Sequence, residues 1–174
     1  MAVPNLTVNE ALRYANHDFL NHLHLIQMNL DLERVEEAKK VIEQLSEHCK
    51  MLSNVNRLKL PKTVEWLQTV NWRYPALQMQ MKSHVLAPVN SEYDEAIVQY
   101  LEKTIIHVYG SLSPYEEQQL FMNIETHEKD CFITFHLIGK WEQSSFSTES
   151  NSLHVETMEE SDTSWKYRIH IYEE

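Results

Sequence analysis

The sequence predicts an α+β fold in which an N-terminal helical hairpin precedes a half that mixes strands and helices. No glycine or proline occurs between Val8 and Asn56, and most residues there are good or tolerable helix formers. Apolar residues in this stretch recur at helical spacing. After Pro61, by contrast, several segments alternate apolar and polar residues, which is typical of half-buried strands.

The helical stretch contains two long apolar patterns. In its first part Leu12, Phe19 and Ile26 lie seven residues apart, with Leu23 and Leu30 as a second row beside them. Its second part carries apolar residues at alternating spacings of three and four, at Val35, Ala38, Ile42, Leu45, Cys49 and Leu52. This second pattern is a heptad seam, the form of apolar surface that helices bury against one another.

The segment 29–34 interrupts both patterns, and Asp31 within it can cap a second helix. We therefore predict two antiparallel helices joined by a short turn. Two such helices cannot cover these stripes alone, and a four-helix bundle made by two copies of the chain would cover them. A homodimer is expected. The alternative is that the second half of the same chain covers the stripes.

The second half changes its period several times. We predict a helix at 63–72, a strand at 77–82, and a helix at 92–109 that ends at Gly110. Strands at 120–124 and 131–138 form a hairpin, and a polar, serine-rich loop at 143–152 precedes a last pair of strands near 153–158 and 165–172. The predicted domains are therefore 1–60, the helical hairpin, and 61–174, an α+β domain.

Charge and composition exclude several classes of partner. Fifteen basic residues against twenty-six acidic ones give a net charge of -11, which would repel the phosphate backbone of a nucleic acid. No apolar run approaches the roughly 20 residues that span a bilayer. Residues 1–5 lack the basic and apolar regions of a signal peptide. We expect a cytoplasmic protein that binds neither nucleic acid nor membrane.

The histidines and cysteines do not predict a metal site. The ten histidines are scattered, and spacings of the H-x-x-x-H or C-x-x-C kind are absent. Cys49 and Cys131 lie far apart on apolar positions, so we expect both to be reduced and buried.

One polar stripe on the first helix carries the candidate chemistry. The stripe consists of residues spaced by four, four, three and four, namely Arg13, His17, Asn21, His24 and Met28. It lies beside the apolar rows, so His17 should face solvent. A single exposed histidine is usually an ordinary surface residue, and the residues around it decide whether it has a role.

The first helix contains the run H-D-x-x-N-x-L, whose named positions are His17, Asp18, Asn21 and Leu23. This run resembles the dimerisation and phosphotransfer domain of the sporulation initiation phosphotransferase B family. The same domain occurs in the related citrate and dicarboxylate sensor histidine kinases. This resemblance implies a phosphorelay phosphotransferase. His17 would accept a phosphoryl group from the aspartyl phosphate of a single-domain response regulator and pass it to an aspartate of a second regulator, a transcription factor, in sporulation initiation. The magnesium ion would be bound by the partner regulator.

The neighbours of His17 have candidate roles in the same chemistry. Asp18 could orient the imidazole or hold its other N–H, and Asn21 could hydrogen-bond the phosphoryl oxygens or the backbone of the partner. For both, an ordinary exposed helix residue is the alternative. The family has a basic residue immediately before the histidine and a lysine after the asparagine, whereas this chain has Asn16 and His22 there. Arg13, one helical turn before His17, could supply the missing charge, or could be a solvated arginine that only steers an acidic regulator.

The second half lacks the glycine-rich turns with which the related kinases hold ATP. The chain has only two glycines, Gly110 and Gly139, and none of its aspartates has a glycine two residues later. Without glycine, side chains obstruct the close backbone approach that phosphate binding needs. The resemblance therefore implies a degenerate histidine-kinase ATPase domain, no cofactor in this chain, and no ATP-dependent kinase activity. The alternative function is a non-catalytic dimeric adaptor that binds and sequesters a response regulator or kinase.

Overall fold

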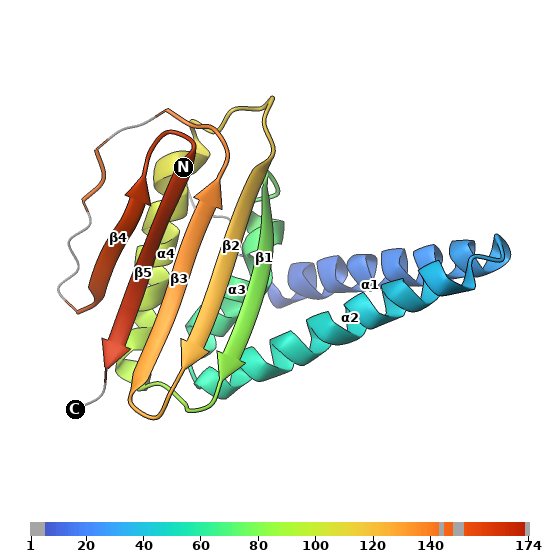
Figure 1. The fold of residues 1–174 in the computed structure, drawn as a ribbon, viewed down its shortest axis with the longest axis horizontal. Helices are drawn as coiled ribbons and strands as arrows, with labels where there is room; N and C mark the ends of the chain where they lie inside the picture. Colours follow the sequence, from blue (N-terminus) through green and yellow to red (C-terminus); the bar gives the residue numbers. More distant parts are fainter. Residues whose placement is uncertain (1–5, 143–144, 148–151, 173–174) are drawn as a thin grey trace. The chain divides into compact units, whose positions relative to one another are not determined.

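The computed structural model describes residues 6–142, 145–147 and 152–172. The chain divides between Ser53 and Asn54 into two compact units, each of which is described here by itself (Figure 1). The segment 1–5 and most of the serine-rich loop predicted at 143–152 lie outside the described residues.

The N-terminal unit is the predicted helical hairpin, made of α1 (Val8–Asp31) and α2 (Val35–Val55). Thr7 and Glu10 form a capping box at the start of α1. The backbone N–H of Glu10 donates to Thr7 Oγ1 at 3.2 Å, and the backbone N–H of Thr7 donates to the Glu10 carboxylate at 2.9 Å. The spacing T-x-x-E was the available signal for this cap.

The turn between the helices differs from the prediction. Asp31 is the last residue of α1, and α2 begins at Val35, so the expected capping of α2 by Asp31 is wrong. The first helix runs on because its last carbonyls find donors in the turn: the N–H of Arg34 donates to the Asn29 carbonyl at 2.8 Å. The chain then reverses at Glu33, which has a left-handed φ of 58°.

The apolar rows are largely uncovered within a single chain. Ala38 and Val41 are the buried hydrophobic residues of α2 before its last turn. Large apolar side chains of the rows on α1 and of the heptad seam on α2 are 42–57% exposed, among them Leu12, Phe19, Leu23, Leu30 and Ile42. Cys49 is exposed as well, so the expectation that it is buried is wrong for the single chain, whereas Cys131 is buried.

The C-terminal unit is α+β, as predicted, and its helices cover one face of a sheet (Figure 1). Its elements are η1 (Asn56–Leu58), α3 (Pro61–Arg73), β1 (Leu77–Val85), η2 (Ser91–Tyr93), α4 (Asp94–Tyr109), β2 (Gln118–Thr126), β3 (Asp130–Ile138), β4 (His154–Glu160) and β5 (Ser164–Tyr172). The five strands lie in the order β1-β2-β3-β5-β4, and only the β1–β2 pair is parallel.

Buried and less buried residues alternate along the strands, and the buried ones form the core of this unit. On β2 the buried hydrophobic residues are Leu120, Met122 and Ile124, and the residues between them, Phe121 and Asn123, are half-buried. The hydroxyl of Tyr167 on β5 donates to Thr104 Oγ1 on α4 at 3.1 Å. The edge strand β4 differs from the others, because most of its residues are exposed and its register shifts between Thr157 and Glu159.

Two carboxylates of α4 hold α3 in place. The nearly buried Asp94 accepts from the backbone N–H groups of Lys62 and Thr63 at 2.9 and 2.8 Å, so it caps a helix whose own N-cap residue, Leu60, has no side-chain acceptor. Glu102 accepts from Trp66 Nε1 at 2.5 Å and also from Arg73 and Tyr74. These charge-assisted contacts tie both ends of α3 to α4.

The two compact units meet after Ser53, which is earlier in the chain than the predicted domain boundary after residue 60. Val55, Leu58 and Leu60 are fully buried, and the Leu58 carbonyl accepts from the N–H of Val89 at 2.9 Å. The end of α2 and the segment after it therefore pack in the C-terminal unit. The functional division at residue 60 remains a prediction.

Candidate functional site

His17 lies in the middle of α1, on a side of the helix that is open to solvent. Its side chain is 70% exposed, and that of Asp18 is 52% exposed. A group that exchanges phosphate with another protein must be reachable from outside, and this position satisfies that requirement. The apolar rows explain the orientation, because Phe19 lies two residues further on, about 200° around an α-helix from His17.

Both hydrogen-bond contacts of the His17 ring are made through Nδ1. Asp18 Oδ1 lies 3.4 Å from Nδ1, and Asn21 Nδ2 lies 3.2 Å from the same atom. Within the described part of the chain, Nε2 has no hydrogen-bond partner. The ring is thus held from one side and presents its other nitrogen outward.

The two contacts favour opposite tautomers of His17. A carboxylate can only accept, so Asp18 favours the form with hydrogen on Nδ1, which leaves a lone pair on Nε2. The amide nitrogen of Asn21 can only donate, so in this orientation it favours hydrogen on Nε2. Rotating the amide by 180° would present its oxygen instead, and both neighbours would then favour the same tautomer. Asp18 is therefore the neighbour whose contact favours a lone pair on Nε2.

His22 does not replace the lysine that the family pattern places after the asparagine. Its Nδ1 lies 2.7 Å from the backbone carbonyl of Asp18, one turn back, so this nitrogen donates to the backbone. The residue is half-buried and lies on a different side of α1 from His17. The spacing of four from Asp18 was the sequence signal for this contact.

Arg13 lies on the same face as His17 without touching it in this conformation. Its guanidinium lies over the Tyr14 ring, 5.6 Å from the ring centroid. The hydrogen bonds from Thr7 lower the pKa of Glu10, and Arg13 contributes a smaller lowering of that pKa. Because Arg13 is exposed and flexible, it can reach toward a group bound at His17, one turn away.

The described residues contain no arrangement suited to a resident metal ion. Across 6–142, 145–147 and 152–172, no three histidine, cysteine, aspartate or glutamate side chains come together as ligands. No helix within these described ranges is both long enough and apolar enough to span a bilayer.

Comparisons with known proteins point to one family for the helical hairpin. Residues 5–58 match the family model described as sensor kinase SpoOB-type, alpha-helical domain. The chain is also 26% identical over 132 residues to sporulation initiation phosphotransferase B of Bacillus subtilis, which covers 72% of this chain and 67% of that protein. The resemblance identified from the H-D-x-x-N run is thereby confirmed, and the matched residues include His17.

Solved structures similar to this chain include two histidine kinases. The blue-light activated histidine kinase of Erythrobacter litoralis matches with a TM-score of 0.47 and 12% identity, over 99% of this chain and 62% of that one. A histidine kinase of Burkholderia phymatum matches with a TM-score of 0.46 and 10% identity, over 96% of this chain and 99% of that one.

The opposing contacts at Nδ1 predict the effect of removing Asp18. In Asp18→Ala, the Asn21 donor remains and the carboxylate acceptor is lost, so the fraction of His17 with hydrogen on Nε2 should rise. An exposed contact of this kind is worth roughly 0.5 kcal/mol, which changes the tautomer ratio about two- to threefold. Long-range ¹H–¹⁵N correlation spectra of the ring measure that ratio. Asp31→Ala on the same helix is the control, and an unchanged ratio in Asp18→Ala would show that Asp18 does not orient the ring.

Proposed function

We propose that this chain is a phosphorelay phosphotransferase, in which His17 accepts a phosphoryl group from the aspartyl phosphate of one response regulator and passes it to an aspartate of a second. The observation that carries the proposal is the exposed His17 within the H-D-x-x-N run, with Nδ1 engaged and Nε2 open. The similarity to sporulation initiation phosphotransferase B supports a phosphorelay role in sporulation.

The proposed transfer needs little covalent assistance from this chain. The Nε2 lone pair attacks phosphorus, a P–N bond forms, the P–O bond to the regulator's aspartate breaks, and its electron pair returns to that carboxylate. The bound magnesium of the regulator would neutralise charge on the phosphoryl oxygens. A neutral imidazole carries a lone pair on one ring nitrogen, so such a ring is a competent nucleophile without a strong general base.

Asp18 and Asn21 have separate roles in this proposal. The hydrogen on Nδ1 stays in place while Nε2 forms its new bond, so positive charge develops on the ring. The Asp18 carboxylate, 3.4 Å from Nδ1, stabilises that charge. Asn21 is a positioning residue one turn on, and its amide can leave Nδ1 to donate to a phosphoryl oxygen. Passage to the second regulator is the same reaction in reverse at the same nitrogen.

The exposed apolar rows of the hairpin support a homodimer. Phe19 and Leu30 on α1 and Ile42 on α2 are each at least half exposed in the single chain, and they belong to the rows that the heptad spacing predicts for a helix interface. A second hairpin would cover these rows and complete a four-helix bundle. His17 lies on the other side of α1, so it would stay open to a regulator.

We expect Ile42→Glu to convert the dimer into a monomer. A buried isoleucine side chain contributes roughly 2–5 kcal/mol, and a carboxylate in the same apolar seam adds a desolvation penalty. Sedimentation velocity measures the result. Gln44→Glu adds the same charge on an exposed, polar position of α2 and should stay dimeric. Wild-type protein that sediments as a monomer at micromolar concentration would contradict the bundle.

We expect His17→Gln to lose phosphoryl acceptance from a phosphorylated regulator while keeping its fold and its oligomeric state. Glutamine keeps a polar side chain of similar length and has no nucleophilic ring nitrogen. The measurement is acid-labile label on this chain after mixing with a regulator labelled on its aspartate. His24→Gln, on the same stripe, is the control and should accept label normally. Regulator binding by the wild-type chain without any acid-labile label would favour the adaptor instead.

We expect Arg13→Ala to slow single-turnover transfer from a saturating phosphorylated regulator, at both low and high ionic strength. A charge-assisted contact to the phosphoryl group is worth roughly 1.5–3 kcal/mol when well placed, which is at least about tenfold in rate. If Arg13 only steered the regulator, the effect of Arg13→Ala on the transfer rate would become smaller at high salt and would disappear at a saturating regulator concentration. Arg34→Ala, at the hairpin turn, is the matched control. If Arg13→Ala transferred at the wild-type rate under saturation, the positive charge that stabilises the phosphoryl group would have to come from the partner regulator.

A further inference from the structure

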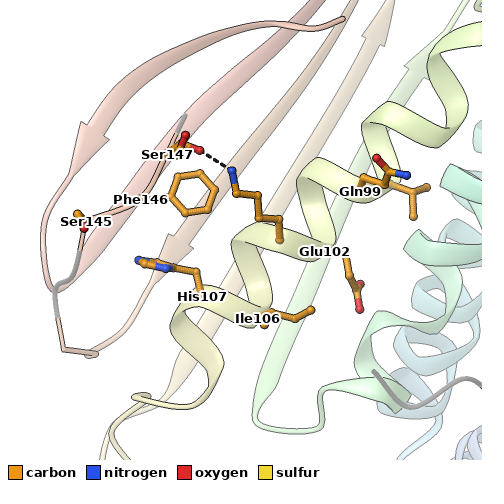
Figure 2. A pocket seen from close by; sticks show the side chains of 9 residues that line it. Gln99, Glu102, Ile106, His107, Ser145, Phe146 and Ser147 are labelled. Carbon is orange, nitrogen blue, oxygen red and sulfur yellow. Dashed lines mark hydrogen bonds between the residues drawn. The ribbon is translucent and has the colours of Figure 1, made fainter. Parts of the chain in front are cut away.

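An open groove runs along α4 in the C-terminal unit, on the side of the helix that faces Ser145–Ser147 (Figure 2). Its volume is about 610 Å³, within the range of small-molecule sites. Val98, Ile106 and Phe146 supply apolar surface, and Gln99, Glu102 and Lys103 supply polar groups. The groove therefore has both features of a ligand site, a mainly apolar wall and a few polar side chains.

Lys103 is a cation that pairs with no carboxylate among the described residues. Its Nζ donates to the Ser147 carbonyl at 2.7 Å, the contact drawn as a dashed line in Figure 2, and it lies 4.7 Å from the centroid of the Phe146 ring. None of the carboxylates whose side chains the structure describes forms an ion pair with it. An ammonium has three donors, so two remain for a ligand.

The acidic residue of the groove is already neutralised. The carboxylate of Glu102 is 14% exposed, is paired with Arg73, and accepts from Trp66 and Tyr74. In Figure 2 Glu102 lies on the opposite side of α4 from Phe146 and Ser147. Among the described residues that line the groove, the charge left unbalanced is consequently positive, in a chain whose net charge is -11.

The Phe146 ring gives this wall a fixed aromatic surface. The ring lies 4.7 Å from Trp165 and 5.1 Å from His107, centroid to centroid, both in edge-to-face arrangements. Trp165 behind it is buried, and its Nε1–H has no acceptor among the described residues. An aromatic ligand next to Phe146 would find a firm surface rather than a freely rotating side chain.

We propose that this groove binds a small organic anion, a flat and hydrophobic monocarboxylate, whose carboxylate contacts Lys103 and whose ring lies against Ile106 and Phe146. Charge complementarity selects the anion, and the apolar wall selects the ring. The site is separate from His17 and does not depend on the function proposed for that residue.

The test titrates the full chain with 2-naphthoate and with its neutral amide, 2-naphthamide, and follows backbone ¹H–¹⁵N resonances. We expect saturable shifts on α4 and at Phe146–Ser147 with naphthoate, and at least about tenfold weaker binding of the amide. Lys103→Met keeps the apolar stem and should bind naphthoate as weakly as the amide. Lys82→Met, an exposed lysine on β1, is the control and should bind normally.

A second variant changes the charge and the apolar wall together without removing the lysine. Ile106 is exposed and one turn from Lys103, so Ile106→Glu should form an intrahelical ion pair with it and compete with naphthoate. Three outcomes would overturn the proposal: shifts confined to the apolar rows of the hairpin, equal binding of the acid and the amide, or saturation by ADP with none by naphthoate.

Discussion

The apolar rows of the hairpin decide how each of its helices is rotated, and the other features of the N-terminal unit depend on that rotation. Two helices in contact along one line can bury only a few residues between them, which here include Ala38 and Val41. The remaining apolar side chains need a surface elsewhere. Because residues two apart on a helix point in nearly opposite directions, a row through Phe19 turns His17 toward solvent. The need to bury apolar surface thus also sets the direction in which the His17 ring points.

In the C-terminal unit, Gly139 is required by packing. A Cβ on Gly139 would lie 1.7 Å from the Gln118 side-chain oxygen, so the close approach of that side chain requires glycine. The Gln118 oxygen in turn accepts from the backbone N–H of Lys140 at 3.1 Å. Neither glycine has a positive φ, and within the described residues that conformation occurs only at Glu33 and Lys59. Two side-chain carboxylates, those of Asp94 and Glu102, join α3 to α4 in this unit.

The sequence predicted the features that depend on periodic patterns and missed those that depend on residues far apart in the chain. Heptad spacing predicted the hairpin, and alternation predicted each strand to within a few residues. The contact between Asp94 and the start of α3 joins residues 31 apart, which no local pattern signals. At the candidate site, the spacing of His17 and Asn21 predicts their contact, because residues four apart lie on one face. The sequence also offered Asp18 as a group that could hold a ring N–H of His17, and the structure places its carboxylate 3.4 Å from Nδ1.

The edge strand β4 has a consequence for how this chain meets copies of itself. An edge strand offers unpaired N–H and C=O groups, to which a strand of another molecule can add, and proteins discourage this with charges and bulges. Here the exposed Glu156, Glu159 and Glu160 accompany the register shift after Thr157. A second copy brought to this edge would place like charges side by side and would not match the strand along its length. The sheet is thereby protected at this edge from aggregation by strand addition.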